Sequence, residues 1–147
     1  MLPLRYQRDE KTADRLYRND GGTYTDISQQ AGLQGNPLGY GLGVGIGDLN
    51  QDGWPDIYVC NDFVEQDYLY INDRKGGFVE SLKAMTKHTS NFSMGNDLAD
   101  FNNDGLIDVM VADMVAEDNY RQKTNMAAMS TEQFYQAVNN GFHYQNM

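Results

Sequence analysis

The chain has 147 residues, which is enough for one compact domain with a core of its own. Its 11 basic and 21 acidic residues leave a formal net charge of −10, and a surface of that sign favours cations and disfavours nucleic acid and anionic membranes as partners. The single cysteine, Cys60, excludes an intrachain disulfide, and no apolar run reaches the length needed for insertion into a membrane.

The chain repeats itself at a spacing of about 50 residues, which is typical of propeller blades. Leu-Tyr-Arg-Asn-Asp at residues 16–20 returns as Leu-Tyr-Ile-Asn-Asp at residues 69–73, and residues 47–59 align in the same way with residues 99–111. The repetition therefore divides the chain into four regions. These are an N-terminal segment (1–15), a first blade repeat (16–68), a second blade repeat (69–125) and a final region (126–147).

Each repeat is predicted to form four short strands separated by turns rich in Gly, Asn and Asp. In the second copy the strands are expected at about 68–72, 77–81, 92–99 and 108–113. In the first copy, residues 39–47 place glycine at every odd position and an apolar or aromatic residue at every even one. A strand with one bare face lets another backbone approach closely, as the crowded inner strands of a propeller require. The predicted fold class is all-β: a partial β-propeller of two four-stranded blades plus a stub.

The final region departs from the strand pattern. Ser-Thr-Glu-Gln at residues 130–133 has capping-box spacing, and apolar residues then follow at helical spacing up to Gly141. We expect one short helical insertion at about 131–140, and the start of a third repeat from His143 onward. Because propellers need about four to eight blades, two copies and a stub indicate a piece of a larger protein. The lack of a signal-peptide-like stretch at the start then carries little weight.

Two loops of oxygen-bearing side chains carry the chemistry of the chain. Residues 48–56 and 100–108 both read Asp-x-Asn-x-Asp-Gly-x-x-Asp. Ca²⁺ is a hard cation that takes six to eight oxygen ligands, and a glycine at the sixth position of such a loop allows the sharp turn that gathers them. We therefore expect two Ca²⁺ sites. Their ligands are Asp48, Asn50, Asp52, Asp56 and the carbonyl of Trp54 in the first loop, and Asp100, Asn102, Asp104, Asp108 and the carbonyl of Leu106 in the second.

Other interpretations of the loops stay open. An EF-hand loop begins in the same way but ends on a glutamate at its twelfth position, where this chain has Val59 and Val111. Because β-type sequence follows both loops, we expect each to join two strands, which disfavours an EF-hand or a dockerin. The remaining alternative is a pair of Asx-rich turns that bind no metal.

An enzyme is the rival function class, since propellers also host polysaccharide lyases and hydrolases. The sequence contains no readable catalytic set and neither a P-loop nor a dinucleotide-binding fingerprint. Only scattered candidates such as His88, Asp97 and Arg121 could contribute to an active site, which missing blades would have to complete. We therefore favour a binding module over an enzyme.

At residues 43–62 and 91–105 the chain resembles the FG-GAP/VCBS repeat family, which includes the calcium-loop blades of integrin α-chains and of bacterial secreted proteins. The closest likeness is to cartilage-acidic-protein-like proteins that carry an ASPIC/UnbV domain. The resemblance implies calcium at both loops and a secreted, periplasmic or cell-surface protein that acts in adhesion, binding or as a scaffold. It also implies an extracellular protein or glycan ligand and further blades of a full propeller as partners. The family's Phe-Gly signature is replaced by Tyr40-Gly41 and Phe92-Ser93, so integrin-like ligand recognition is not implied.

Overall fold

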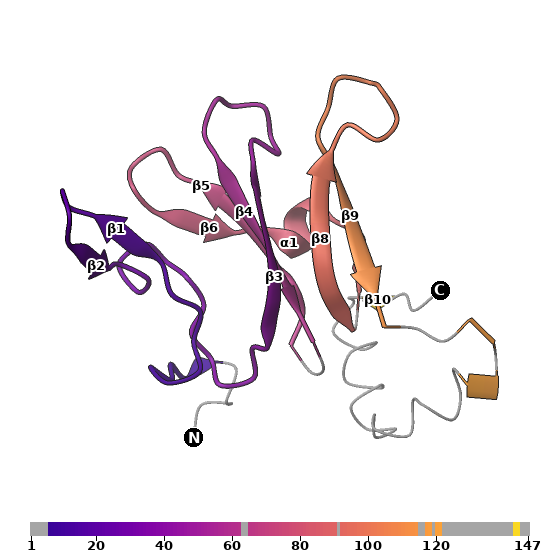
Figure 1. The fold of residues 1–147 in the computed structure, drawn as a ribbon, viewed down its shortest axis with the longest axis horizontal. Helices are drawn as coiled ribbons and strands as arrows, with labels where there is room; N and C mark the ends of the chain where they lie inside the picture. The colour runs from indigo at the N-terminus through magenta and orange to yellow at the C-terminus, as the bar shows by residue number, and fades with distance from the viewer. Residues whose placement is uncertain are drawn as a thin grey trace.

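The computed structural model describes residues 6–62, 65–90, 92–114, 117–118, 120–121 and 143–144, and these are mostly antiparallel β-strands (Figure 1). This confirms the all-β class. The elements in chain order are β1 (Tyr17–Asn19), β2 (Tyr24–Asp26), β3 (Gly41–Gly47), β4 (Asp56–Asn61), β5 (Tyr68–Asn72), β6 (Phe78–Glu80), α1 (Leu82–Met85), β7 (His88–Thr89), β8 (Ser93–Ala99), β9 (Asp108–Asp113) and β10 (His143–Tyr144). Within the described residues, no helix is long and apolar enough to cross a membrane.

One four-stranded antiparallel sheet, in the order β3-β4-β5-β6, forms the centre of the structure. Strands β4 and β5 are rich in β-branched and aromatic residues, which suit a pleated surface packed on both faces, and β4 is almost entirely buried. The sheet takes β3 and β4 from the first sequence repeat and β5 and β6 from the second. The structural unit therefore begins at Gly41, in the middle of a sequence repeat.

The core lies on both faces of this sheet, because successive side chains of a strand point to opposite sides. On one face, Tyr58 and Cys60 of β4 pack with Leu69 of β5 and with Leu82 of α1. On the other face, the alternate residues of the same strands form a second cluster. Its buried members are Val59, Tyr68 and Tyr70.

Strand β3 packs through its glycine face against β8 of the neighbouring two-stranded sheet, β8-β9 (Figure 1). The approach is close enough that a Cβ atom added to Gly43 would lie 2.8 Å from the Cα atom of Gly95. The alternate residues Leu42, Val44 and Ile46 are 48%, 64% and 67% exposed. The alternation in the sequence therefore places a bare surface on one side of β3 and an apolar row on the other.

The structure has a short helix, α1, and a short strand near the end of the chain, β10, among the described residues. The helix expected at 131–140 lies outside the described residues. The short helix α1 was not predicted from the sequence; the carboxylate of Glu80 accepts a hydrogen bond from the amide of Leu82, the first residue of the helix, at 2.8 Å. Strand β10, where the third repeat was expected to start, pairs in parallel with β7.

Candidate metal-binding loops

Both candidate loops join two antiparallel strands, and they project from the same end of the two sheets (Figure 1). Loop one, residues 48–56, connects β3 to β4, and loop two, residues 100–108, connects β8 to β9. Each loop is closed by the last residue pair of its ladder, Gly47 with Asp56 and Ala99 with Asp108. The sequence-based prediction of strand-loop-strand units is confirmed.

In loop one, the carboxylate of Asp48 lies over the turn and accepts hydrogen bonds from two backbone amides. The amide of Asp52 donates to Oδ1 at 2.9 Å, and the amide of Gly53 donates to Oδ2 at 2.8 Å. The chain turns sharply here because Gln51 and Gly53 both have left-handed φ angles, of 57° and 85°. Glycine adopts this region at little cost, which suits Gly53 to its position. The first carboxylate is therefore held at the mouth of the turn.

Loop two repeats this arrangement almost atom for atom. The amides of Asp104 and Gly105 donate to the two carboxylate oxygens of Asp100 at 3.0 and 2.8 Å. Asn103 and Gly105 have φ angles of 62° and 85°. Two loops with different residues at the variable positions thus adopt one conformation, which indicates that the shared Asp, Asn and Gly residues determine it.

The middle positions of the two loops also match. In loop one, the amide of Asp52 donates to Asn50 Oδ1 at 3.1 Å, and the amide of Trp54 donates to Asp52 Oδ1 at 2.9 Å. The corresponding bonds in loop two measure 2.9 Å to Asn102 Oδ1 and 2.8 Å to Asp104 Oδ1. The predicted ligands at positions 1, 3 and 5 therefore lie along the same turn in both loops.

The aspartate at the ninth position has a second role that the sequence did not reveal. Asp56 is fully buried; its Oδ2 accepts the amide of Leu49 at 3.0 Å, and its Oδ1 accepts the amide of Asn72 at 2.9 Å. In loop two, Asp108 accepts the amide of Phe101 at 3.2 Å in the same way. The ninth residue thus fastens the end of each loop to its beginning, and in loop one also to β5.

The chemistry of these side chains fits calcium, although they are not gathered around a common point. Among the residues that the structure describes, no three His, Cys, Asp or Glu side chains converge closely enough to hold a metal ion. The loop carboxylates bind backbone amides instead. Because a carboxylate has about four acceptor positions, those at the first position keep capacity for a further ligand. Three carboxylates, one amide oxygen and one carbonyl per loop form an all-oxygen set, which suits Ca²⁺.

The two loops differ in their electrostatic surroundings. Arg74, on the turn between β5 and β6, donates to Asp52 Oδ2 from Nε at 3.1 Å and from Nη2 at 2.9 Å. Partial burial raises the pKa of Asp52, but the hydrogen bonds from Arg74 and Asn50 outweigh it and hold this pKa below its ordinary value. Asp52 therefore stays ionised to a lower pH than an ordinary aspartate.

The residues weighed for catalysis belong to different segments of the chain. His88 is in β7, Asp97 is in β8, and Arg121 forms an ion pair with Asp118 at 3.4 Å.

A buried polar cluster around Asp67 was also missed by sequence analysis. The Asp67 carboxylate is fully buried and accepts hydrogen bonds from Tyr58 Oη, the Asn61 amide and Ser93 Oγ, each at 2.8 Å. Burial raises the pKa of Asp67, while these hydrogen bonds act in the opposite direction. The cluster ties β4 to β8, at the end of the strands away from the loops.

The comparison with known families rests on these same segments. A family model described as "FG-GAP-like repeat" matches residues 6–59 and residues 48–111. Each matched stretch ends with one of the two loops and the strand after it, and together they cover well over half of the chain. The chain belongs to the FG-GAP-like repeat family. Its two aspartate loops therefore occupy equivalent places in successive FG-GAP-like repeats.

A curated relative extends this comparison. The FG-GAP-like chain is similar to "Integrin alpha-7" of Rattus norvegicus, with 38% identity over 73 residues. The aligned part makes up 47% of this chain and 6% of the integrin, so the chain spans a small fraction of that relative's length. The similarity is a distant relationship over part of the chain.

Proposed function

We propose that this chain is a calcium-stabilised FG-GAP-like module of a secreted, periplasmic or cell-surface protein, and that it acts in binding, adhesion or as a scaffold rather than as an enzyme. The observation that carries the proposal is the shared conformation of the two loops, in which matched Asp and Asn side chains line turns at one end of the sheets. The family and the partial similarity to an integrin α-chain support the placement outside the cytoplasm.

The proposed role of calcium is to neutralise carboxylates that otherwise repel one another. In loop one, Asp48, Asn50, Asp52 and Asp56 would hold the ion with the carbonyl of Trp54; the matching residues of loop two would hold a second ion. When bound, each ion supplies two positive charges and no redox or acid–base chemistry, so its effect is on stability. Two ions would offset four of the ten excess negative charges of the chain.

The exposed apolar row on β3, formed by Leu42, Val44 and Ile46, supports further blades as the nearest partners. Within this chain, the equivalent face of β8 packs against the glycines of β3. By the same geometry, the row on β3 fits the small-residue face of a preceding repeat. We propose that such a repeat covers it in a complete propeller of the cartilage-acidic-protein-like type, and that the ligand is an extracellular protein or glycan bound by the assembled molecule.

Calorimetric titration of the full chain with calcium chloride tests the proposal. We expect two ions per chain with dissociation constants of about 10⁻⁴–10⁻³ M, as in other extracellular modules, and poor competition by Mg²⁺, which demands a compact octahedral site. Asp52→Ala and Asp104→Ala should each reduce the number of bound ions to one. These variants remove one carboxylate from loop one and loop two, respectively.

Asp73→Ala is the matched control. Asp73 forms a similar Asx turn between β5 and β6, where its Oδ1 accepts the amides of Lys75 and Gly77 at 2.7 and 2.9 Å, but it belongs to neither loop. This variant should still bind two ions. A wild type that shows no binding heat at about 10 mM calcium, well above the expected range, and no change in unfolding temperature on chelation would establish the metal-free Asx-turn interpretation instead.

A further inference from the structure

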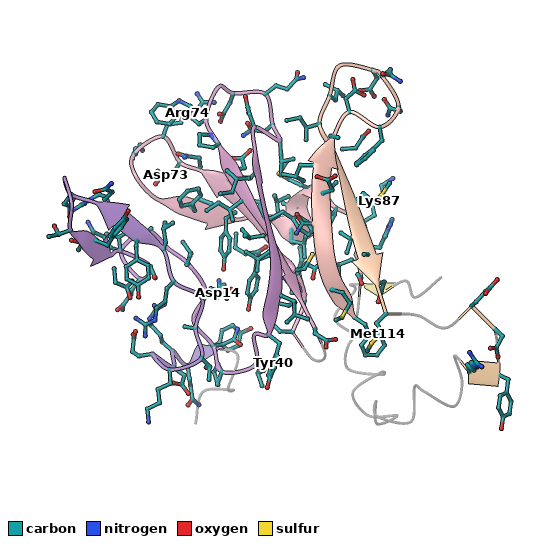
Figure 2. All side chains as sticks on the ribbon, viewed as in Figure 1. Asp14, Tyr40, Asp73, Arg74, Lys87 and Met114 are labelled. Atoms are coloured by element: carbon teal, nitrogen blue, oxygen red, sulfur yellow. The ribbon has the colours of Figure 1, made fainter. Side chains whose placement is uncertain are left out.

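The side chain of Arg74 places a positive charge against loop one. Figure 2 shows Arg74 beside Asp73 on the turn between β5 and β6, and its side chain reaches Asp52 of loop one through Nε and Nη2. The side chain of Asp52 is only 10% exposed, whereas that of Arg74 is 58% exposed. The ion pair therefore covers the carboxylate from the solvent side.

The contact uses up the acceptor capacity of one carboxylate oxygen. Asp52 Oδ2 accepts both hydrogen bonds from Arg74 and a third from Asn50 Nδ2 at 3.0 Å. A carboxylate oxygen has two lone pairs, so three donors leave no room for a metal at Oδ2. The other oxygen, Oδ1, already accepts the amide of Trp54. The carboxylate at the fifth position of loop one thus keeps one acceptor position, on Oδ1.

The turn that carries Arg74 is itself fixed to loop one. Asn72 donates its amide to Asp56 Oδ1 at 2.9 Å and its side-chain Nδ2 to the carbonyl of Pro55 at 3.2 Å. Its own Oδ1 accepts the amide of Arg74 at 2.8 Å, and Arg74 has a φ angle of 60°. The backbone from which the guanidinium extends is therefore held beside the loop whether or not the ion pair is formed.

Loop two has no such charge in the part of the chain that the structure describes. There the Oδ1 atom of Asp104 accepts the amide of Leu106 at 2.8 Å, and no described Lys or Arg side chain forms an ion pair with Asp104. Among the described residues, the two loops share a ligand pattern and a backbone conformation, but only loop one has an arginine on its fifth-position carboxylate.

We propose that Arg74 is a tethered cation that competes with calcium for Asp52, so that loop one binds calcium more weakly than loop two. The inference rests on the proposed function. Calcium can bind Oδ2 of the fifth-position carboxylate of loop one only after the guanidinium has left that oxygen, and the guanidinium then remains nearby as a repelling charge. A unit charge a few ångströms from a divalent ion at a solvated surface corresponds to roughly tenfold in affinity.

The test compares two charge-removing variants in the full chain, both carrying Asp104→Ala so that only loop one is titrated. Arg74→Gln removes the competing charge, and Lys75→Gln removes an equal charge from the neighbouring position of the same turn. With calcium chloride in a calorimeter, Arg74→Gln should tighten binding about tenfold, and Lys75→Gln should change it less than twofold. In the Asp52→Ala background, which leaves loop two, Arg74→Gln should have no effect.

A spectroscopic measurement isolates loop one without the second substitution. Trp54 is the only tryptophan of the chain and lies at the seventh position of loop one. Terbium chloride, a luminescent substitute for calcium in oxygen-lined sites, should therefore show indole-sensitised emission from loop one. Emission should reach half its maximum at about tenfold less terbium in Arg74→Gln than in wild type or Lys75→Gln.

The outcomes separate this inference from the function on which it rests. Calcium binding that responds equally to Arg74→Gln and Lys75→Gln, or that weakens in Arg74→Gln, would overturn the competition and leave calcium binding itself intact. Weaker calcium binding in Arg74→Gln would instead mean that Arg74 stabilises the conformation of loop one. Absence of binding in every variant and in wild type would overturn both proposals together.

Discussion

Ser28 positions the carboxylate of Asp26 at the end of β2. Ser28 is fully buried, and its hydroxyl and amide donate to Asp26 Oδ1 at 2.6 and 3.0 Å. These hydrogen bonds lower the pKa of Asp26 from 3.8 to about 2. The hydrogen bond from the Ser28 hydroxyl has the largest effect, and Arg15 contributes less. Because the folded pKa lies below the unfolded one, this group stabilises the fold fully above pH 3.8. The stabilisation is lost as the pH falls toward 2.

Ser28→Ala should raise the pKa of Asp26 toward 3.8, which carboxyl-carbon NMR titration measures directly. It should also cost about 1–3 kcal/mol in free energy of unfolding, because the amide of Leu16 donates to Ser28 Oγ at 2.7 Å and would lose its acceptor. Ser81→Ala is the control, since its hydroxyl donates to a backbone carbonyl rather than to a carboxylate. An unchanged Asp26 titration in Ser28→Ala would show that the backbone amide of residue 28 and Arg15, and not the Ser28 hydroxyl, lower this pKa.

At the scale of residues, the sequence identified the loop positions but not their partners. The aspartates and asparagines of each loop lie close together in the chain, so their spacing alone places them on one turn. The contacts of Asp52 with Arg74, of Asp56 with Asn72 and of Asp67 with Ser93 join residues 22, 16 and 26 positions apart. Such pairs depend on how the strands are arranged, which local spacing does not determine.

Among the elements, strands β3 and β8 depend on an unusually close contact between the glycine face of β3 and the backbone of β8. Gly43→Ala should destabilise the chain by about 1–3 kcal/mol, because the new methyl group would lie 2.8 Å from the Cα atom of Gly95 and both backbones would have to move. Urea unfolding followed by circular dichroism measures this. Gly95→Ala is the matched control in the facing strand, where an added Cβ atom meets nothing within 4 Å.

Gly95→Ala should therefore change the free energy of unfolding by no more than about 0.5 kcal/mol. Equal effects of the two substitutions would mean that general backbone flexibility, and not the contact between β3 and β8, explains these glycines. A smaller effect at Gly43 than at Gly95 would contradict the packing arrangement itself.

The strands were predictable from sequence because period-two alternation and Gly, Asn and Asp turns act over a few residues. The grouping of the strands into sheets was not predictable, since β5 and β6 complete a sheet that begins in the preceding sequence repeat. Helix α1 was not foreseen because four residues are too few to show a helical period; the hydrogen bond from the Leu82 amide to Glu80 and the burial of Leu82 stabilise it instead. The helix expected at 131–140 remains a prediction.

At the scale of the whole molecule, the two loops are in direct contact. The side chain of Gln51, at the fourth position of loop one, donates from Nε2 to the carbonyl of Gly105 in loop two at 3.1 Å. Because that carbonyl belongs to the sharpest part of the second turn, ordering loop one also restrains loop two. Calcium binding at either loop should therefore favour binding at the other, and by linkage the effect is reciprocal.

A double-mutant cycle measures this coupling through the calcium-dependent part of the free energy of unfolding. At calcium about 100 times the dissociation constant, each occupied loop should add roughly 2.7 kcal/mol. The variant carrying both Asp52→Ala and Asp104→Ala should lose less calcium-dependent stability than the two single variants lose in sum, by about 0.5–1 kcal/mol. The reason is that each single substitution removes the coupling between the loops as well as its own site.

Gln51→Asn shows whether the hydrogen bond carries that coupling. Asn103 occupies the same position of loop two with a φ angle of 62°, close to the 57° of Gln51, so asparagine suits the backbone of loop one. Its side chain is one methylene shorter and should not reach Gly105. In the Gln51→Asn background the two losses should therefore add to within about 0.3–0.5 kcal/mol. If the two losses of calcium-dependent stability already add in the wild-type background, the loops act independently despite their contact. If the losses remain non-additive in the Gln51→Asn background, the coupling passes through the packing of β3 on β8 and not through this hydrogen bond.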